Sequence, residues 1–570
     1  MHSAATAFLE ALTEAGVSYI FATLGSDHPP IIEAVAEGKA SGRHFPKLLT
    51  CPNEMVALSA AQGYAQVSGQ AQAVVIHVEC GTQALGGAMH NAMRGRVPVL
   101  ILAGATPFTQ EGELKGGRNE WIQWIQDIRD QRAIVRNYVR YDYELRTGRN
   151  IKQIVHRAMQ MATSDPKGPV YLVAPREVLE EEAPPVKIEI GEWRPVAPIA
   201  LRDEDAAEIA AALAAAKRPL AVTSYVGRNP AAVGELVNLC RRVGMALVES
   251  APTHMNFPHD DLLYMGNRWS DPRQDPILAD ADVVLVIDSD APWIPSMSKP
   301  GPKAKVFHID VDPLKDTIPL WYIKAHRSFR ADAATALTQI NAHIGKSKPG
   351  KDATEKKQAH YAALHRKRAD ELEKNEKRDD TIITPEFLTA CIRRRIDRDT
   401  IVLSEGITNY PVIANHIAPS LAGAFYTSGG SSLGWHGGAA IGMKLAHPDK
   451  TIVCLTGDGS YMFSIPSSVH WMARRYDAAF LTVIYNNRGW KAPKFSALLV
   501  HPKGHASRAN EIGVEFDPVP DYSAIAAAAG GAHARKVEKP GEVEEALEEA
   551  LNIVRNENRC AVLDFVLPHL

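Results

Sequence analysis

The chain has 570 residues, of which 45% are hydrophobic and 23% charged. A single core rarely serves such a length, so we expect two to four domains. The formal net charge is −3 and there is no long basic run, which argues against nucleic acid as the main partner. No apolar run is long enough to span a bilayer, so we expect no membrane segment.

The N-terminal segment 1–16 has the pattern of an amphipathic helix. It lacks the basic start and the continuous apolar core of a signal peptide. The six cysteines are scattered without the spacing of a metal or redox motif, which is typical of reduced thiols in a cytoplasmic protein. They stand at positions 51, 80, 240, 391, 454 and 560. We therefore predict a cytoplasmic location.

The first predicted domain, 1–185, alternates helical and strand patterns. Its middle strands are almost continuously apolar, as in a parallel sheet covered on both faces. The strands are expected at 17–25, 47–51, 73–79, 97–104 and 169–175. An acidic run and Pro184-Pro185 then indicate a linker.

Two further α/β units follow. The second, 195–345, begins with the Ala-rich helical segment 206–216, and its strands are expected at 219–224, 246–250, 282–288 and 305–312. A Lys-rich stretch, 346–381, is expected to be a solvated helix or linker. The third unit, 382–570, has strands expected at 400–406, 451–457, 480–486 and 561–567. The sequence therefore predicts an α/β protein with three doubly wound parallel-sheet domains.

The third unit contains two short polar motifs, one after each of two apolar strands. Gly457-Asp458-Gly459-Ser460 follows the first strand, and Asn486-Asn487-Arg488-Gly489 follows the second. The segment between them has helical spacing, so the unit predicts a parallel strand pair with a right-handed crossover. Asp458 and Asn487 then lie past the carboxyl ends of the strands, where open α/β sheets bind ligands.

A carboxylate, an amide oxygen and free backbone carbonyls suit a hard cation such as Mg²⁺. A helix N-terminus beside them offers N–H groups to a phosphate. Each motif alone also fits an ordinary turn or strand cap. Because both occur in register around one strand–helix–strand unit, we favour a site for a metal-bridged diphosphate.

The pair of motifs resembles the signature of thiamine diphosphate (ThDP) enzymes that act on 2-oxo acids, a family that includes acetolactate synthases, benzoylformate decarboxylases and benzaldehyde lyases. The resemblance implies a pyrimidine-binding, a middle and a diphosphate-binding domain. It implies that Asp458, the Asn487 side chain and the Gly489 carbonyl bind Mg²⁺. The residues that it places around the cofactor diphosphate are Gly457, Asp458, Gly459, Ser460, Asn487 and Gly489.

Glu54 follows a short predicted strand and is expected to open a helix. Its segment PNEMVALSAAQGYAQVSG, 52–69, resembles the family's activating-glutamate segment. By that match Glu54 hydrogen-bonds the cofactor's pyrimidine and promotes deprotonation of its reactive carbon. A poorly solvated glutamate suits this role because its raised pKa favours sharing a proton. The alternative is a Glu that only stabilises its helix N-terminus. The resemblance also places the active site at a dimer interface, in a homodimer or homotetramer.

The Gly-rich segment 427–449 resembles the family's segment that contacts the cofactor rings. By that match Leu433 is wedged between the two rings, although core packing also explains one Leu. Trp435-His436 departs from the family pattern. His436 either faces the cofactor or is a polar surface residue.

The candidates for substrate chemistry lie in the loops after the strands. Asp27 and His28 follow the first strand, and His77 resembles the active-site His of benzoylformate decarboxylase. A His could shuttle protons near neutral pH, whereas a structural His is the alternative. Gln123 or Gln126 matches a Gln that related enzymes direct to the cofactor, and we take Gln123 as the candidate. A loop beginning Trp490-Lys491 should cover the site.

The resemblance favours a ThDP- and Mg²⁺-dependent, acetolactate synthase-like carboligase with a small-molecule substrate. A non-ligating 2-oxo acid decarboxylase or a hydroxyacyl lyase is the alternative within the enzyme class. A catalytically silent regulatory subunit is the alternative from another class. We expect no FAD, because the flavin-binding segment of acetolactate synthases is absent and 286–295 reads VIDSDAPWIP.

Overall fold

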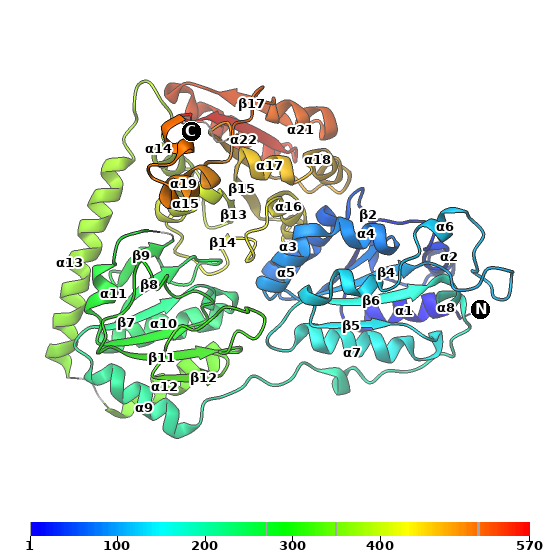
Figure 1. The fold of residues 1–570 in the computed structure, drawn as a ribbon, viewed down its shortest axis with the longest axis horizontal. Helices are drawn as coiled ribbons and strands as arrows, with labels where there is room; N and C mark the ends of the chain where they lie inside the picture. The colour runs from blue at the N-terminus through cyan, green and yellow to red at the C-terminus, as the bar shows by residue number, and fades with distance from the viewer. Residues whose placement is uncertain (1, 270, 348–349, 510–512, 570) are drawn as a thin grey trace.

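The computed structural model describes residues 2–269, 271–347, 350–509 and 513–569. It contains three six-stranded sheets, each with its helices (Figure 1), and every pair of neighbouring strands is parallel. The predicted α/β fold with three parallel-sheet domains is confirmed. Within these ranges no helix is long and apolar enough to cross a membrane.

The first sheet has the order β2-β1-β3-β4-β6-β5. Its central strands are fully buried, as their apolar sequences predict. The strands are β1 (Tyr19–Ala22), β2 (Lys47–Thr50), β3 (Gln72–Ile76), β4 (Val99–Ala105), β5 (Tyr141–Glu144) and β6 (Val170–Pro175). The helices are α1 (Ala4–Glu14), α2 (Pro29–Ser41), α3 (Glu54–Ser68), α4 (Val78–Ala84), α5 (Gly86–Arg94), α6 (Ile122–Ile125), α7 (Ile151–Thr163) and α8 (Arg176–Glu180).

The middle sheet has the order β12-β11-β10-β7-β8-β9, so the strand order reverses between β7 and β10. Its strands are β7 (Pro219–Thr223), β8 (Ala246–Ser250), β9 (Tyr264–Arg268), β10 (Val283–Ile287), β11 (Lys305–Asp310) and β12 (Arg327–Arg330). Its helices are α9 (Asp203–Ala215), α10 (Pro230–Val243), α11 (Pro276–Asp280) and α12 (Ala333–Ser347). The long helix α13 (Lys351–Asn375) then runs beside this domain toward the third one (Figure 1).

The third sheet, β14-β13-β15-β16-β18-β17, repeats the strand order of the first. Its strands are β13 (Thr400–Glu405), β14 (Phe425–Tyr426), β15 (Thr451–Gly457), β16 (Leu481–Asn486), β17 (His533–Val537) and β18 (Ala561–Val566). Its helices are α14 (Pro385–Arg393), α15 (Tyr410–Ile417), α16 (Trp435–Ala446), α17 (Asp458–Phe463), α18 (Pro466–Arg475), α19 (Lys491–Val500), α20 (His505–Ala509), α21 (Tyr522–Gly530) and α22 (Val543–Asn556). The predicted parallel pair around the polar motifs is β15–β16.

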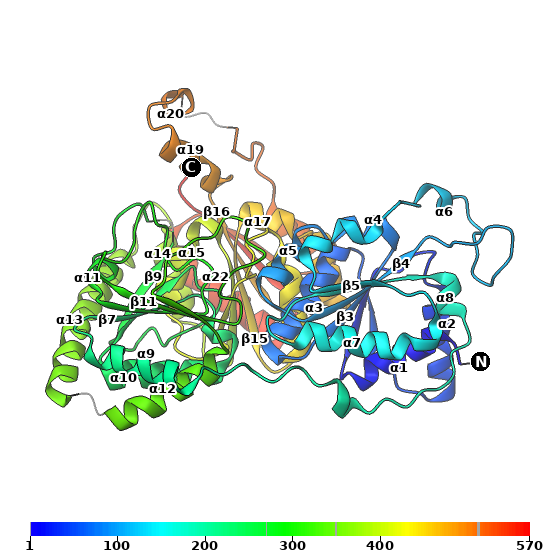
Figure 2. The ribbon, with the colours of Figure 1, turned by 60° about the horizontal axis from the view of Figure 1, so that its bottom comes forward.

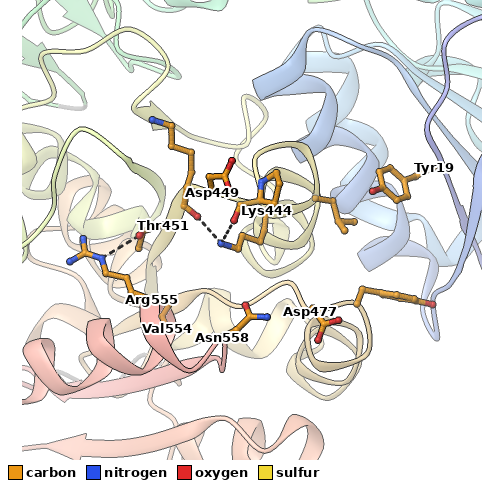
Figure 3. Close-up of a pocket in the computed structure, with 12 residues that line it drawn as sticks. Tyr19, Lys444, Asp449, Thr451, Asp477, Val554, Arg555 and Asn558 are labelled. Carbon is orange, nitrogen blue, oxygen red and sulfur yellow. Dashed lines mark hydrogen bonds between the residues drawn. The ribbon is translucent and has the colours of Figure 1, made fainter.

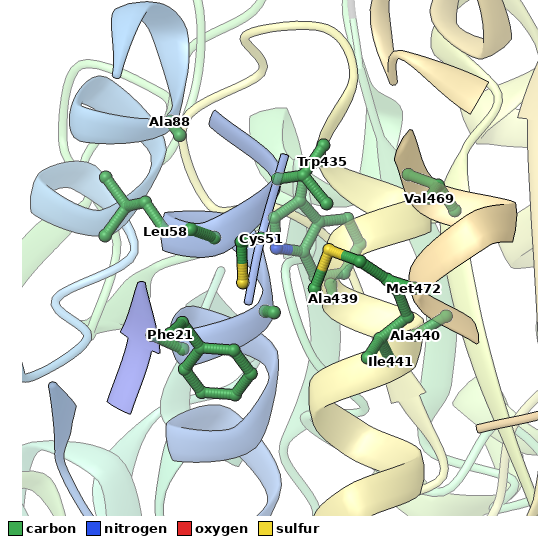
Figure 4. Close-up of a cluster of buried hydrophobic side chains, with 14 of the residues drawn as sticks. Phe21, Cys51, Leu58, Ala88, Trp435, Ala439, Ala440, Ile441, Val469 and Met472 are labelled. Atoms are coloured by element: carbon green, nitrogen blue, oxygen red, sulfur yellow. The ribbon is translucent and has the colours of Figure 1, made fainter. Parts of the chain in front are cut away.

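The first and third domains share one hydrophobic core, in which α3 packs against α16 (Figure 4). The two helices cross closely because small residues face each other. A Cβ atom at Gly442 would overlap the Ala60 carbonyl oxygen, and one at Gly63 would overlap the backbone of Ala439. At the starts of the helices, a Cβ at Gly434 would stand 2.9 Å from Met55 Cε. The crossing therefore holds the start of α3 beside the start of α16 within one chain.

Five of the six edge strands lie outside the segments predicted as strands: β5, β9, β12, β14 and β17. An edge strand is not covered on all sides, so it does not need a continuous apolar run. The strand β12 reads RSFR and buries only Phe329, and β17 buries only Val537. The apolar pattern therefore identified the centres of the sheets and one edge strand, β2, and missed the other five edge strands.

We predict that Gly442→Ala destabilises the protein by about 1–3 kcal/mol, because the added methyl group forces apart α3 and α16. Gly234→Ala is the matched control: Gly234 lies inside α10, and a Cβ there meets nothing within 4 Å. This control should stabilise by about 0.5–1 kcal/mol through helix propensity. Urea denaturation measures both variants, and equal effects of the two changes would contradict a tight crossing.

Candidate functional site

Asp458 is buried at the carboxyl end of β15, with 3% of its surface exposed. Its Oδ1 accepts the N–H of Gly459 at 2.7 Å, and its Oδ2 accepts the N–H of Gly489 at 3.0 Å. Burial raises the pKa of Asp458 to about 6 although these hydrogen bonds oppose the shift. The carboxylate thus links the loop after β15 to the loop after β16.

The loop after β16 contains two further oxygen atoms that suit a metal ion, the Asn487 Oδ1 and the Gly489 carbonyl oxygen. Asn487 is 7% exposed, and its Oδ1 is buried without a hydrogen-bond partner. Gly489 forms an isolated antiparallel bridge with Glu515, which is flanked by the hydrogen bonds Trp490 N–H to Val514 O and Phe516 N–H to Arg488 O. In this type of pair the N–H and C=O of Gly489 point away from Glu515. The Gly489 carbonyl therefore faces the side on which its N–H meets Asp458.

The neighbouring Asn486 has a different environment. Its Nδ2 donates to Asp564 Oδ1 at 2.9 Å, and its Oδ1 accepts the N–H of Arg488 at 3.1 Å. Asn486 is therefore already satisfied inside the sheet, whereas Asn487 has an unused oxygen. The geometry selects Asn487 as the possible ligand.

The residues present fit an Mg²⁺ ion. An unpartnered buried amide oxygen costs free energy unless it finds a partner, and a divalent cation supplies one. In the part of the chain that the structure describes, no group of three or more His, Cys, Asp or Glu side chains could hold a metal. A site of one carboxylate, one amide and one carbonyl differs from such clusters and takes its remaining ligands from water or a phosphate.

The first domain presents a second polar cluster at the carboxyl ends of β1, β3 and β4. Asp27 is 2% exposed, and its Oδ1 accepts a hydrogen bond from His77 Nδ1 at 2.6 Å. A Cβ at Gly104, in β4, would overlap the Asp27 carboxyl group, so glycine is required there. The His77 side chain is 23% exposed. The hydrogen bond with Asp27 raises the pKa of His77 despite partial burial.

His28 and Val78 complete the surroundings of Asp27. Burial alone would raise the pKa of Asp27, but His28 and then His77 outweigh it and hold that pKa well below its ordinary range. His28 Nδ1 lies 3.0 Å from Asp27 Oδ1 but also accepts the N–H of Gly25, and its side chain is fully buried. Val78 donates its N–H to Asp27 Oδ2 at a φ of 31°, which is strained for a β-branched residue.

Glu54 begins α3, as predicted. The Asn53 side chain, and not Glu54, caps the N-terminus of this helix. A Cβ at Gly81 would stand 3.0 Å from Glu54 Oε1, so the carboxyl group lies against α4. Burial raises the pKa of Glu54, which favours its protonated form, and the charge of His77 opposes the shift. Glu54, Asp27 and His77 thus belong to one cluster.

The structure places Gln126 beside the cluster and Gln123 in a different environment. Gln123 is 3% exposed, and its Oε1 accepts the N–H groups of Asn119 and Glu120 at 2.9 and 3.3 Å. It therefore stabilises its own loop. Gln126 instead places its Nε2 3.1 Å from His77 Nε2. One helical turn separates the two, and periodicity alone could not decide which faces the cluster.

Leu433 lies just before α16 and is partly exposed. His436 is not a surface residue: it is 1% exposed, and its Nδ1 lies 2.6 Å from Glu405 Oε2. Glu405 belongs to no recognised motif, and its only mark in the sequence is that an acidic residue ends a buried strand. His436 is therefore held by the third domain itself.

Trp490 lies over the start of α17, because a Cβ at Gly459 would stand 2.6 Å from its Nε1. The following segment, expected as a loop, forms α19 and α20, which project from the body of the molecule (Figure 2). Lys491 Nζ lies 5.5 Å from the centre of the Phe495 ring within this segment. Of this segment, Trp490 is the residue placed at the candidate site.

A pocket of about 620 Å³ opens at the other end of β15 (Figure 3). Its walls include Tyr19, Lys444, Thr451, Asp477 and Arg555. Thr451 is the first residue of β15, whereas Asp458 follows the last. Seven strand residues separate the two ends by about 20 Å. This pocket is therefore distinct from the candidate metal site.

The middle domain is fastened to the first by a buried ion cluster. Arg96 Nη1 donates to Asp310 Oδ1 at 2.9 Å, and Lys315 Nζ donates to Asp310 Oδ2 at 2.6 Å. Tyr225 donates its hydroxyl to the same oxygen at 2.7 Å. Arg96 lies between α5 and β4 of the first domain, whereas Tyr225 follows β7, and Asp310 and Lys315 lie at and after the end of β11. The absence of FAD stays a prediction.

Three family models match the chain in sequence. Residues 2–134 match the N-terminal TPP binding domain of thiamine pyrophosphate enzymes, 206–340 match their central domain, and 406–565 match their C-terminal TPP binding domain. Thiamine pyrophosphate, or TPP, is another name for ThDP. The three matches follow the three sheets and together span most of the chain.

Individual relatives are distant but match over nearly full length. The chain is 25% identical to acetolactate synthase isozyme 3 large subunit of Escherichia coli, over 90% of this chain and 86% of that protein. It is 22% identical to the acetolactate synthase large subunit of Haemophilus influenzae, over 97% and 92%.

Two solved structures share the fold. Benzoylformate decarboxylase from Polynucleobacter necessarius has a TM-score of 0.79 at 19% identity, with 100% of both chains covered. The 4-hydroxybenzoylformate decarboxylase of Rhodococcus jostii has a TM-score of 0.78 at 19% identity, covering 100% of this chain and 99% of that one. With the three domain matches, these similarities show that the chain belongs to the thiamine pyrophosphate enzyme family.

Proposed function

We propose that the protein is a ThDP- and Mg²⁺-dependent carboligase that cleaves and forms C–C bonds next to the carbonyl group of 2-oxo acids or 2-hydroxy carbonyl compounds. The observation that carries the ThDP chemistry is the partly buried Glu54 carboxyl, whose pKa is raised by burial, in a chain that also places Asp458 and the unpartnered Asn487 oxygen after β15 and β16. The acetolactate synthase relatives support the carboligase assignment.

The third domain would hold the cofactor by its diphosphate. We propose that Asp458, the Asn487 amide oxygen and the Gly489 carbonyl bind Mg²⁺, and that Leu433 contacts the cofactor rings. Gly457, Gly459 and Ser460 are proposed to contact the diphosphate.

The first domain would supply the proton chemistry. When bound, ThDP supplies a nucleophilic carbon that adds to the substrate carbonyl. The Glu54 carboxyl shares a proton with the cofactor's pyrimidine ring, because its raised pKa lowers the cost of holding that proton. His77 is the proposed proton donor to the substrate, while Asp27 fixes its ring through Nδ1. Gln126, which contacts His77 Nε2, replaces Gln123 as the proposed glutamine.

A decarboxylase or hydroxyacyl lyase is the second candidate. The Asp27–His77 pair favours it, since a decarboxylase must return a proton to the carbon that loses CO₂. The silent regulatory subunit is disfavoured by the presence of both Glu54 and the proposed metal ligands.

We further propose a cytoplasmic homodimer or homotetramer with active sites at the dimer interface. The six cysteines are free in the described structure.

A substrate panel tests the proposal. The protein is incubated with ThDP and Mg²⁺ and with pyruvate or an aromatic 2-oxo acid, with and without an aldehyde acceptor. A 2-hydroxyketone product supports the carboligase. An aldehyde formed without need for an acceptor supports the decarboxylase, and no turnover of any substrate supports the silent subunit.

In the same assay we predict that Glu54→Gln lowers kcat by about 10²–10⁴-fold, because the amide cannot exchange the proton. Cofactor affinity should change little, since the amide keeps the shape of the side chain. The exposed Glu37→Gln serves as control and should retain full turnover. A fully active Glu54→Gln enzyme would refute the assignment.

The pH dependence tests the role of His77. Because Asp27 raises the pKa of His77, the imidazolium persists to higher pH than in an ordinary His, and a step that needs this proton fails as pH rises through that pKa. Asp27→Asn should move this fall in kcat to lower pH. The exposed Asp130→Asn is the control and should leave the profile in place. An unmoved profile in Asp27→Asn would mean that His77 is not the proton donor.

A further inference from the structure

Glu405 is the last residue of β13 and is 1% exposed. Among the residues that the structure describes, its carboxylate accepts hydrogen bonds only from the start of α16. Oε1 accepts the N–H groups of Gly434 and Trp435 at 2.7 and 3.2 Å. Oε2 accepts the N–H of His436 at 2.9 Å and faces its Nδ1 at 2.6 Å.

This contact replaces the usual helix cap. A helix leaves its first N–H groups without partners, and a local Ser, Thr, Asp or Asn normally accepts them. Here the N-cap residue is Gly434, which has no side chain and a φ of 96°. The acceptor comes instead from a strand 29 residues earlier in the chain. The turn that carries Leu433 is therefore fixed to the sheet as well as to its own helix.

The same cluster reaches the strand that carries the metal motif. Glu405 pairs with Thr456 in the register of β13 and β15. Thr456 Oγ1 lies 3.3 Å from His436 Nδ1, and Thr456 precedes Gly457 and Asp458 by one and two residues. Glu405 and His436 thus connect the Leu433 turn to the start of the proposed metal site.

We propose that Glu405, with His436, is a positioning residue that sets the Leu433–Gly434 turn relative to Asp458. This inference rests on the proposed cofactor site. Glu405 acts through backbone N–H groups and the His436 ring, and it need not touch the cofactor itself. Its loss should therefore affect the part of the cofactor that Leu433 contacts and spare the part that the metal holds.

A purely structural cap makes a different prediction. If Glu405 only stabilised α16, its replacement would lower the stability of the protein. It would then affect binding of the ring part and of the diphosphate part of the cofactor equally. Two probes separate the parts: ThDP, which has both rings and a diphosphate, and inorganic pyrophosphate, which has the diphosphate alone. Both are titrated calorimetrically into the full-length protein in the presence of Mg²⁺.

Glu405→Gln should weaken ThDP binding on the order of tenfold and pyrophosphate binding by less than about twofold. Adding Leu433→Ala to Glu405→Gln should cost less affinity than Leu433→Ala costs in the wild type, because both act through the same contact. Glu249→Gln is the matched control: Glu249 is equally buried and lies 3.1 Å from His259 Nε2, but it belongs to the middle domain. It should leave the affinity for both probes unchanged.

His436→Leu provides a second variant if Glu405→Gln does not fold. It removes the ring donor but leaves the backbone N–H groups on the carboxylate, and it should cause the same selective loss. His436→Asn, which keeps an N–H donor, should restore ThDP affinity. An equal loss for both probes, or an unchanged ThDP affinity, would overturn the role of Glu405. Failure of the wild type to bind ThDP would instead overturn the proposed cofactor site.

Discussion

The close crossing of α3 and α16 is the constraint on which the rest of the structure depends. The helices can approach only because Gly63, Gly438 and Gly442 present no side chains at the contact. One consequence is a hydrophobic core shared by two domains that are far apart in the sequence. Another is that Met55, beside Glu54, meets Gly434, beside Leu433. A contact made of small residues thus sets the relative position of two polar segments.

The first and third domains repeat one strand order but differ in chemistry at the same edge. In the first, the carboxyl ends of the strands present Asp27 and His77, and α3 begins with Glu54. In the third, they present Asp458 and Asn487, and Glu405 caps α16. The shared fold supplies equivalent positions, to which the proposed function assigns proton transfer in the first domain and metal binding in the third. The middle domain is joined to the first through Arg96 and Asp310.

The sequence predicted what depends on local pattern. Buried central strands are continuously apolar, so the three sheets and the β15–β16 pair could be located, and Glu54 was correctly placed at a helix start. Edge strands such as β12 lack that pattern and were missed. Gln123 and Gln126 differ only in which side of a short helix they occupy, which depends on tertiary packing. The partnership of Glu405 and His436 joins residues 31 apart, and nothing in the local sequence indicates it.

Calorimetric titration with ThDP tests the account most directly, because the buried, unpartnered Asn487 oxygen is the atom proposed to bind Mg²⁺. The account predicts binding by the wild type in Mg²⁺ and little binding in a chelator. Asn487→Ala should lose most of the Mg²⁺-dependent affinity, whereas Asn486→Ala, whose partner is Asp564, should lose mainly stability. Binding that is independent of Mg²⁺, or equal in wild type and Asn487→Ala, would contradict the account.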